Sequence, residues 1–259
     1  MTRGERRAAL EAIASEVRSC TRCRLSESRT LAVPGEGDPD TEVVLVGEGP
    51  GFNEDREGRP FVGRAGGLLV RLLASIGWQR EDVFITNVVK CRPPENRDPE
   101  PDEIAACAPY LRRQLEVLDP AVVVTLGRHS MATFLPGARI GQVHGTTHPA
   151  DPSTGARDAL VFAMYHPAAA LRTPALEHES LEDVARVPAT LLRSRELRAA
   201  HAAAPAPAAG PDTRAPDAGP AAPAADPGPA PDLAPALASP ALDAAADPAA
   251  DDASQLTLF

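Results

Sequence analysis

Residues 42–55 have the sequence EVVLVGEGPGFNED, in which a short apolar run passes directly into a glycine-rich, acidic loop. The run at 42–46 is rich in β-branched residues, and similar runs follow at 83–86, 121–126 and 160–164. Each run is continuously apolar rather than alternating, which is typical of strands covered on both faces. The sequence therefore predicts four buried strands.

Segments with helical periodicity separate these strands. Helices are predicted at 65–76 and 100–118, another precedes the first strand at 6–17, and a last one follows at 181–200. Strands that alternate with helices favour an α/β fold with an open, mostly parallel sheet of four strands flanked by helices. Ligands of such sheets bind beyond the carboxyl ends of the strands, so the residues that follow each strand are the candidates for function.

Residues suited to ligand binding follow the predicted strands. They are Glu48, Gly49, Gly51, Glu54 and Phe61 after the first strand, Asn87 after the second, the segment 127–130 after the third, and His166 after the fourth. Each has an ordinary explanation when taken alone, as a helix-start acid, a turn amide, a core aromatic or a strand-end histidine. Their convergence on one edge of the sheet predicts a ligand site.

The four cysteines form two couples, Cys20 with Cys23 and Cys91 with Cys107. Two cysteines separated by two residues place their thiolates on one tight turn, which suits a metal centre. The sequence opens on a charged helix pattern rather than a secretory signal, so we expect a cytoplasmic protein in which disulfides are disfavoured. A four-cysteine metal site is predicted, and the spacing alone does not choose between zinc and an iron–sulfur cluster.

The composition changes near residue 201 to alanine, proline, aspartate and glycine. Such a segment cannot bury enough apolar surface to offset its ordering entropy, so we expect a folded domain at 1–200 followed by a disordered tether at 201–254. From residue 201 onward, eight aspartates stand against Arg214, and this net charge of −7 accounts for most of the chain's −10. The overall acidity therefore does not exclude a nucleic-acid partner. No apolar run approaches the ~20 residues of a membrane helix.

Four ordered motifs, together with the cysteines, resemble the family 4 uracil-DNA glycosylases, the iron–sulfur branch of their superfamily. The motifs are GEGPG at 47–51 followed by Glu54 and Asp55, GRPFVG at 58–63, TNVVKCRPP at 86–94 and HPAA at 166–169. The resemblance implies the three-layer sandwich of these enzymes. It also implies that the protein hydrolyses the N-glycosidic bond of uracil in DNA and so starts base excision repair.

The resemblance further implies a role for each candidate residue. Phe61 would stack on a flipped-out uracil, Asn87 would pair with N3–H and O4 of the base, and a neutral or cationic His166 would lie against O2. Glu48, Gly49 and Gly51 would contact the base and sugar, with Glu54 close by, and the two glutamates join His166 as catalytic candidates. Cys20, Cys23, Cys91 and Cys107 would hold a 4Fe–4S cluster.

Two other interpretations stay open at the level of sequence. One is a catalytically weak member of the same superfamily that only binds uracil or DNA, and the other is an unrelated α/β protein with a zinc site and a nucleotide ligand. A related branch that traps the sugar covalently carries a histidine-containing insertion after the second strand. Residues 90–99 contain no histidine, which disfavours that branch. We expect a monomer.

Residues 255–259 have the sequence QLTLF. This pentapeptide resembles the short motif with which bacterial repair and replication proteins bind the sliding clamp. Gln255, Leu256, Leu258 and Phe259 would be its contact residues, joined to the enzyme by the tether. A motif of this length also occurs by chance, so clamp binding is a hypothesis.

Overall fold

The computed structural model describes residues 1–203. The predicted pentapeptide and nearly all of the predicted tether therefore lie outside the described residues. The last helix continues to Ala203, three residues past the expected boundary of the folded domain.

The four predicted strands are confirmed as the parallel centre of one sheet. They are β2 (Val43–Gly47), β3 (Phe84–Asn87), β4 (Val122–Leu126) and β6 (Leu160–Met164). Every residue of the four strands is buried, in agreement with their continuous apolar character. The strands are adjacent in the order β3-β2-β4-β6, with Leu45 opposite both Ile85 and Val124.

The sheet has six strands within residues 1–203, so the prediction of four was too low. Two short edge strands, β1 (Glu36–Gly37) and β5 (Thr147–Pro149), pair antiparallel with β3 and β6. These strands are two and three residues long, lie at exposed edges and are rich in glycine, threonine or proline. They leave no apolar period in the sequence, because edge strands this short bury little surface.

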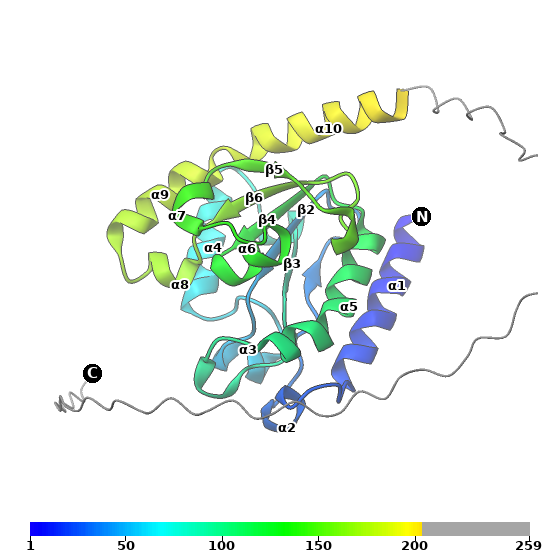
Figure 1. Ribbon diagram of the computed structural model, residues 1–259, viewed down its shortest axis with the longest axis vertical. Helices are drawn as coiled ribbons and strands as arrows, with labels where there is room; N and C mark the ends of the chain where they lie inside the picture. The colour runs from blue at the N-terminus through cyan, green and yellow to red at the C-terminus, as the bar shows by residue number, and fades with distance from the viewer. Residues whose placement is uncertain (204–259) are drawn as a thin grey trace, which may run out of the picture. The chain divides into compact units, whose positions relative to one another are not determined.

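Ten α-helices and three 3-10 turns accompany the strands in the described part of the chain (Figure 1). They are α1 (Arg3–Arg18), α2 (Leu25–Ser28), α3 (Phe52–Glu57), α4 (Arg64–Ser75), α5 (Pro101–Leu118), α6 (Arg128–Phe134), α7 (Ile140–Val143), α8 (Pro167–Ala170), α9 (Pro174–Val184), α10 (Val187–Ala203), η1 (Arg80–Asp82), η2 (Pro94–Asn96) and η3 (Pro152–Thr154). The predicted helices at 6–17, 65–76 and 100–118 are confirmed as α1, α4 and α5.

The predicted helix at 181–200 is wrong, because two helices share that segment. α9 ends at Val184 and α10 begins at Val187. Pro188 explains the break, since proline has no N–H to donate and its ring collides with the carbonyl group four residues earlier. At the second position of a new helix, the missing donor costs nothing.

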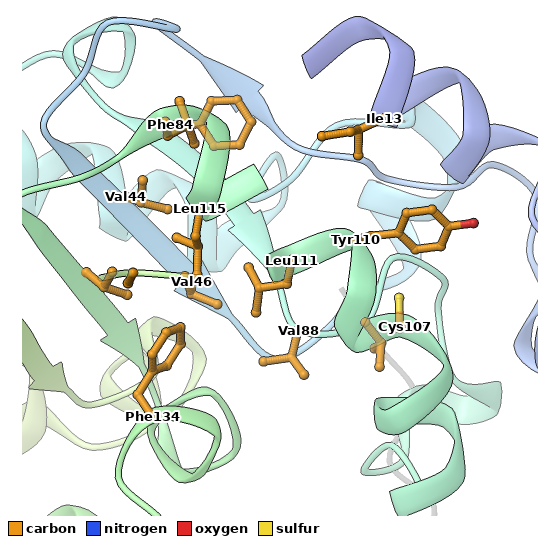
Figure 2. Close-up of a cluster of buried hydrophobic side chains, with 14 of the residues drawn as sticks. Ile13, Val44, Val46, Phe84, Val88, Cys107, Tyr110, Leu111, Leu115 and Phe134 are labelled. Carbon is orange, nitrogen blue, oxygen red and sulfur yellow. The ribbon is translucent and has the colours of Figure 1, made fainter. Parts of the chain in front are cut away.

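The sheet lies between two helical layers, which confirms the predicted three-layer architecture. Leu111 and Leu115 of α5 pack against Val44 and Val46 on one face, where Ile13 of α1 completes the cluster (Figure 2). On the other face, leucines of α4 pack against alternate strand residues, together with side chains of α9 and α10. None of the described helices combines the length and apolar character needed to cross a membrane.

Candidate active site

A cavity of about 760 Å³ opens at the carboxyl ends of the parallel strands. Residues that follow each central strand line it, namely Glu48 after β2, Asn87 at the end of β3, Gly127 after β4, and Tyr165 and His166 after β6. The chain places β3 on one side of β2 and β4 on the other, so the connections diverge at this edge and leave a crevice. The predicted convergence of candidate residues is therefore observed.

Asn87 is the last residue of β3 and its side chain is buried at the cavity wall. Only 1% of the residue is exposed, yet its side-chain Oδ1 has no hydrogen-bond partner among the described residues. A buried amide oxygen without a partner costs about 1–3 kcal/mol, so such groups are rare unless a ligand supplies the missing donor. The Asn87 side chain thus offers a buried acceptor that no described residue satisfies.

Phe61 forms an aromatic wall of the same cavity in an unusual backbone conformation. Its φ angle is +51°, a region costly for a residue with a large side chain. The turn is held by Glu54, whose Oε1 accepts hydrogen bonds at 2.9 Å from the backbone N–H groups of both Val62 and Gly63. The Phe61 ring stacks with the imidazole of His166 at a centroid separation of 5.8 Å and an interplanar angle of 30°.

His166 precedes α8, and its contacts define its protonation state. The imidazole Nδ1 accepts a hydrogen bond from the backbone N–H of Ala168 at 3.1 Å, so the proton of the neutral ring is on Nε2. Burial lowers the pKa of His166 to about 4, with the charge of Arg172 acting in the same direction. The neutral form is thus present near neutral pH, and it carries one N–H donor.

Two glycines allow these side chains to come close together, and both lie in segments that the sequence indicated, although neither was predicted as a site residue by itself. A Cβ at Gly47 would lie 2.4 Å from Oδ1 of Asn87 and 2.7 Å from the Phe61 ring, and one at Gly127 would lie 2.8 Å from Cβ of His166. Gly127 also has a φ angle of +96°, which other residues rarely adopt. Their position directly at the ends of β2 and β4 was the available signal.

A second cluster of polar side chains lines the cavity around Glu48. The Nε2 atom of His129 lies 3.8 Å from Oε2 of Glu48 and 3.2 Å from Oδ1 of Asp98, and Arg128 pairs with the same aspartate at 2.5 Å. Burial is the main cause that raises the pKa of Glu48; nearby Asp98 raises it further and His129 opposes the shift. Asp98 was not among the predicted site residues, because long-range ion pairs leave no local pattern in the sequence.

All four cysteines line one small apolar cavity beside α1 and α5. Cys20 and Cys23 follow α1, Cys91 follows β3, and Cys107 lies within α5; all four are free thiols. Arg29 Nη1 donates to Sγ of Cys91 at 3.0 Å. Burial raises the pKa of Cys91 and raises that of Cys107 to about 11, so thiolates here require a positive centre. Four converging sulfur ligands with N–H donors fit an iron–sulfur cluster or zinc.

Lys90 lies between the cysteine cavity and the end of β3. Its Nζ atom donates to the carbonyl oxygen of Asn87 at 2.8 Å and to side-chain oxygens of Thr86 and Gln114 at 2.6 and 2.7 Å. Its backbone N–H donates to Sγ of Cys107 at 3.3 Å. One buried residue thus connects the backbone of Asn87 to one of the four converging cysteines.

The fold and cavity define an α/β protein in which an aromatic ring, an amide and an imidazole line one cavity at the carboxyl ends of the strands. The sequence profile of the Uracil DNA glycosylase superfamily matches residues 34–187. The chain therefore belongs to the uracil-DNA glycosylase superfamily. The predicted enzyme class, a hydrolase of N-glycosyl bonds, agrees with this membership.

Individual relatives agree with the predicted branch. The chain is 50% identical to a type-4 uracil-DNA glycosylase of Sulfurisphaera tokodaii over 69% of its own length and 83% of the relative's. It is 45% identical to a type-4 uracil-DNA glycosylase of Thermotoga maritima, covering 68% and 91% of the two chains. A type-5 uracil-DNA glycosylase of Thermus thermophilus is 36% identical, with 52% and 68% covered. The higher identity to type-4 proteins confirms the resemblance to family 4.

Proposed function

We propose that this protein hydrolyses the N-glycosidic bond of uracil in DNA, after the base has been flipped out of the stack into the cavity. The unpartnered, buried Oδ1 of Asn87 is the observation that carries the proposal. Uracil presents an N3–H donor beside the O4 acceptor, and an asparagine amide matches this pair with its oxygen and its NH₂ group. A base must leave the duplex for such an edge to be read.

Asn87 also accounts for selection against cytosine. Cytosine has no proton on N3 and carries an amino donor at C4, so both groups of the amide would face the wrong partner. Each buried polar group left unpaired in this way costs about 1–3 kcal/mol. Phe61 supplies the face on which the base stacks, and Glu54 acts as a positioning residue that holds the Phe61 turn.

His166 stabilises the leaving base. Cleavage of the glycosidic bond moves negative charge onto uracil, part of it onto O2, and the Nε2–H of a neutral imidazole can donate to that oxygen. The Ala168 N–H keeps Nδ1 as an acceptor, so the ring presents its single proton from the other nitrogen. This contact strengthens as charge develops, and it therefore favours the transition state over the bound substrate.

We assign the activation of the attacking water to Glu48. Its carboxylate lines the cavity beside His129, and its raised pKa makes it a better proton acceptor than an ordinary glutamate. Gly49 and Gly51 follow it in the same loop and line the cavity, where they would contact the base and sugar. The proton taken from water passes to Glu48 as oxygen bonds to the anomeric carbon.

The four cysteines hold a 4Fe–4S cluster in this proposal. When bound, the cluster supplies a cationic iron centre that neutralises the thiolates and joins the end of α1 to β3 and α5. Among the described residues, the linings of the cysteine cavity and of the active-site cavity have no residue in common, and this separation favours a structural role. A brown protein with broad visible absorption supports iron–sulfur, and a colourless protein containing zinc contradicts it.

We further propose that the protein acts as a cytoplasmic monomer whose segment 255–259 binds the sliding clamp. The sequence of that pentapeptide is the support for this partner. Its contact residues are Gln255, Leu256, Leu258 and Phe259.

An excision assay on short oligonucleotides tests the enzymatic proposal. Wild-type protein should release uracil, but not cytosine, from single-stranded and paired DNA. Asn87→Asp should reduce uracil excision at least about 100-fold, since loss of one or two buried hydrogen bonds corresponds to ~2–4 kcal/mol. Gln142→Glu makes the same amide-to-carboxylate change on α7, at an exposed position outside the cavity lining, and should retain activity. Binding of uracil-containing DNA by wild type without release of uracil would instead support the binding-only alternative.

A further inference from the structure

Phe52 is an exposed aromatic side chain beside the active-site cavity. It is the first residue of α3 and directly follows Gly51, which lines the cavity. The residue is 52% exposed, and it is the only aromatic among the large apolar residues that are exposed within 1–203. Single exposed apolar residues are common, so exposure alone assigns no role.

Two arginines from different segments lie over the Phe52 ring. The guanidinium carbon of Arg92 lies 5.2 Å from the ring centroid, and that of Arg56 lies 5.6 Å from it. Arg56 is in α3, whereas Arg92 belongs to the loop that follows Asn87 and is held by a 2.8 Å hydrogen bond to Oδ1 of Asn96. The chain segments that follow β2 and β3 thus form this aromatic–arginine cluster, next to the cavity residues Glu48 and Asn87.

Several arginines in or beside the cavity have no acidic partner among the described residues. Neither Arg56 nor Arg92 has a carboxylate within ion-pair distance in the described part of the chain, and the same holds for Arg64 and Arg172, which line the cavity. Most other arginines within residues 1–203 are paired with a carboxylate, for example Arg113 with Glu16, and so are Arg97 and Arg128 of the cavity lining. Positive charge is therefore available at the cavity mouth, where a phosphate backbone would lie.

We propose that Phe52, with Arg56 and Arg92, forms a stacking platform for the nucleotide adjacent to the flipped uracil. This inference rests on the proposed function and extends it from the excised base to its neighbour in the strand. A base that stacks on the ring replaces one guanidinium group, which then pairs with the phosphate beside that base. Stacking requires an unpaired neighbour, so the platform favours single-stranded or frayed DNA.

Binding to an uncleavable oligonucleotide tests the platform. The probe is a single strand with 2′-fluoro-2′-deoxyuridine in place of deoxyuridine and 2-aminopurine on its 5′ or 3′ side. Wild type should quench the 2-aminopurine fluorescence on one side only. Phe52→Ala should abolish the quenching and weaken binding about 5- to 150-fold, the range for loss of one stacked base. Phe52→Trp should restore both.

Matched variants separate the platform from general effects. Leu192→Ala removes an exposed apolar side chain that is 57% exposed on α10, and it should bind like wild type. Arg56→Gln should lower the slope of log affinity against log salt by about 0.7, the value for one contact to a single-stranded phosphate. Arg193→Gln on α10 should leave that slope unchanged.

Two outcomes distinguish failure of the platform from failure of the proposed function. If wild type excises uracil but Phe52→Ala matches it in quenching and affinity, the platform is wrong and the enzymatic proposal stands. If wild type releases no uracil from the natural oligonucleotide, the enzymatic proposal is wrong, whatever the result for Phe52→Ala. Circular dichroism of each variant checks that the fold is retained.

Discussion

At the scale of single residues, the position of the site was predictable and its electrostatics were not. Asn87 and His166 follow strands directly, and the strand-end rule brings such residues together without knowledge of the loops. The protonation of His166 depends on the backbone N–H of Ala168 and on burial, which only the folded chain defines. The pairing of His129 with Glu48 and Asp98 likewise joins three distant segments.

The pH dependence of excision tests these residue assignments. The pKa of Glu48 is raised above 4.5 and that of His166 is lowered to about 4. The carboxylate form of Glu48 is lost as pH falls through its raised pKa, whereas His166 stays neutral until about pH 4. Single-turnover rates should therefore show an acid limb at a pH above the ordinary pKa of a glutamate, and Glu48→Gln should be slower and lack that limb.

His166→Ala serves as the comparison in the same experiment. This variant should lower the rate at every pH while the acid limb stays in place, because the neutral imidazole does not titrate in that window. DNA affinity should change little, since the contact gains its strength as charge develops on the base. An acid limb that disappears in His166→Ala but persists in Glu48→Gln would reverse the two assignments.

At the scale of elements, long apolar periods were predictable and short or interrupted segments were not. The four central strands and helices α1, α4 and α5 each bury a continuous stripe or run, and this pattern is visible in sequence. The edge strands β1 and β5 lack such a signal. Pro188 was the available sign that α9 and α10 are separate helices, which end at Val184 and begin at Val187.

Two adjacent glycines of α4 provide a matched test of how this helix supports the site. A Cβ at Gly66 would lie 1.8 Å from the carbonyl oxygen of Phe61, whereas one at Gly67 would have no atom within 4 Å. Gly66→Ala should displace the Phe61 turn, lowering both the melting temperature and uracil excision. Gly67→Ala should stabilise the exposed helix position by up to ~1 kcal/mol, or about 2–4 °C in melting temperature, and leave excision unchanged.

Thermal melts and excision rates of both variants decide this prediction. The change of residue type is the same in both proteins, so helix propensity cancels in the comparison and the contact with Phe61 remains. Equal stability and equal activity of the two variants would show that α4 does not hold the Phe61 turn.

At the scale of the whole molecule, the chain divides its charge and its tasks between two parts. Residues 1–200 carry a net charge of only −3, and the arginines over Phe52 leave positive charge beside the cavity, so the enzyme part is suited to a phosphate backbone. Residues from 201 onward carry −7 and are repelled by DNA. We propose a protein partner for this acidic segment, with QLTLF at 255–259 as the contact.

Deletion of residues 255–259 tests the sliding clamp as that partner. Leu258 and Phe259 are the apolar anchors in this proposal, and Gln255 contributes hydrogen bonds that set the register. A short peptide that becomes ordered on binding loses conformational entropy, so we expect a dissociation constant around 1 μM, or ~8 kcal/mol of binding free energy. Calorimetric titration of the full chain against the cognate clamp should show this affinity, and the truncated chain should show none.

Two controls make the result specific to the pentapeptide. Leu258→Ala combined with Phe259→Ala should abolish clamp binding as the deletion does, whereas Thr257→Ala, which changes a residue outside the proposed contacts, should retain it. All variants should excise uracil from short free oligonucleotides at the wild-type rate, because residues 34–187 carry the superfamily match. Equal clamp binding by the full and truncated chains, or binding by neither, would exclude the pentapeptide as a clamp ligand and leave the excision proposal intact.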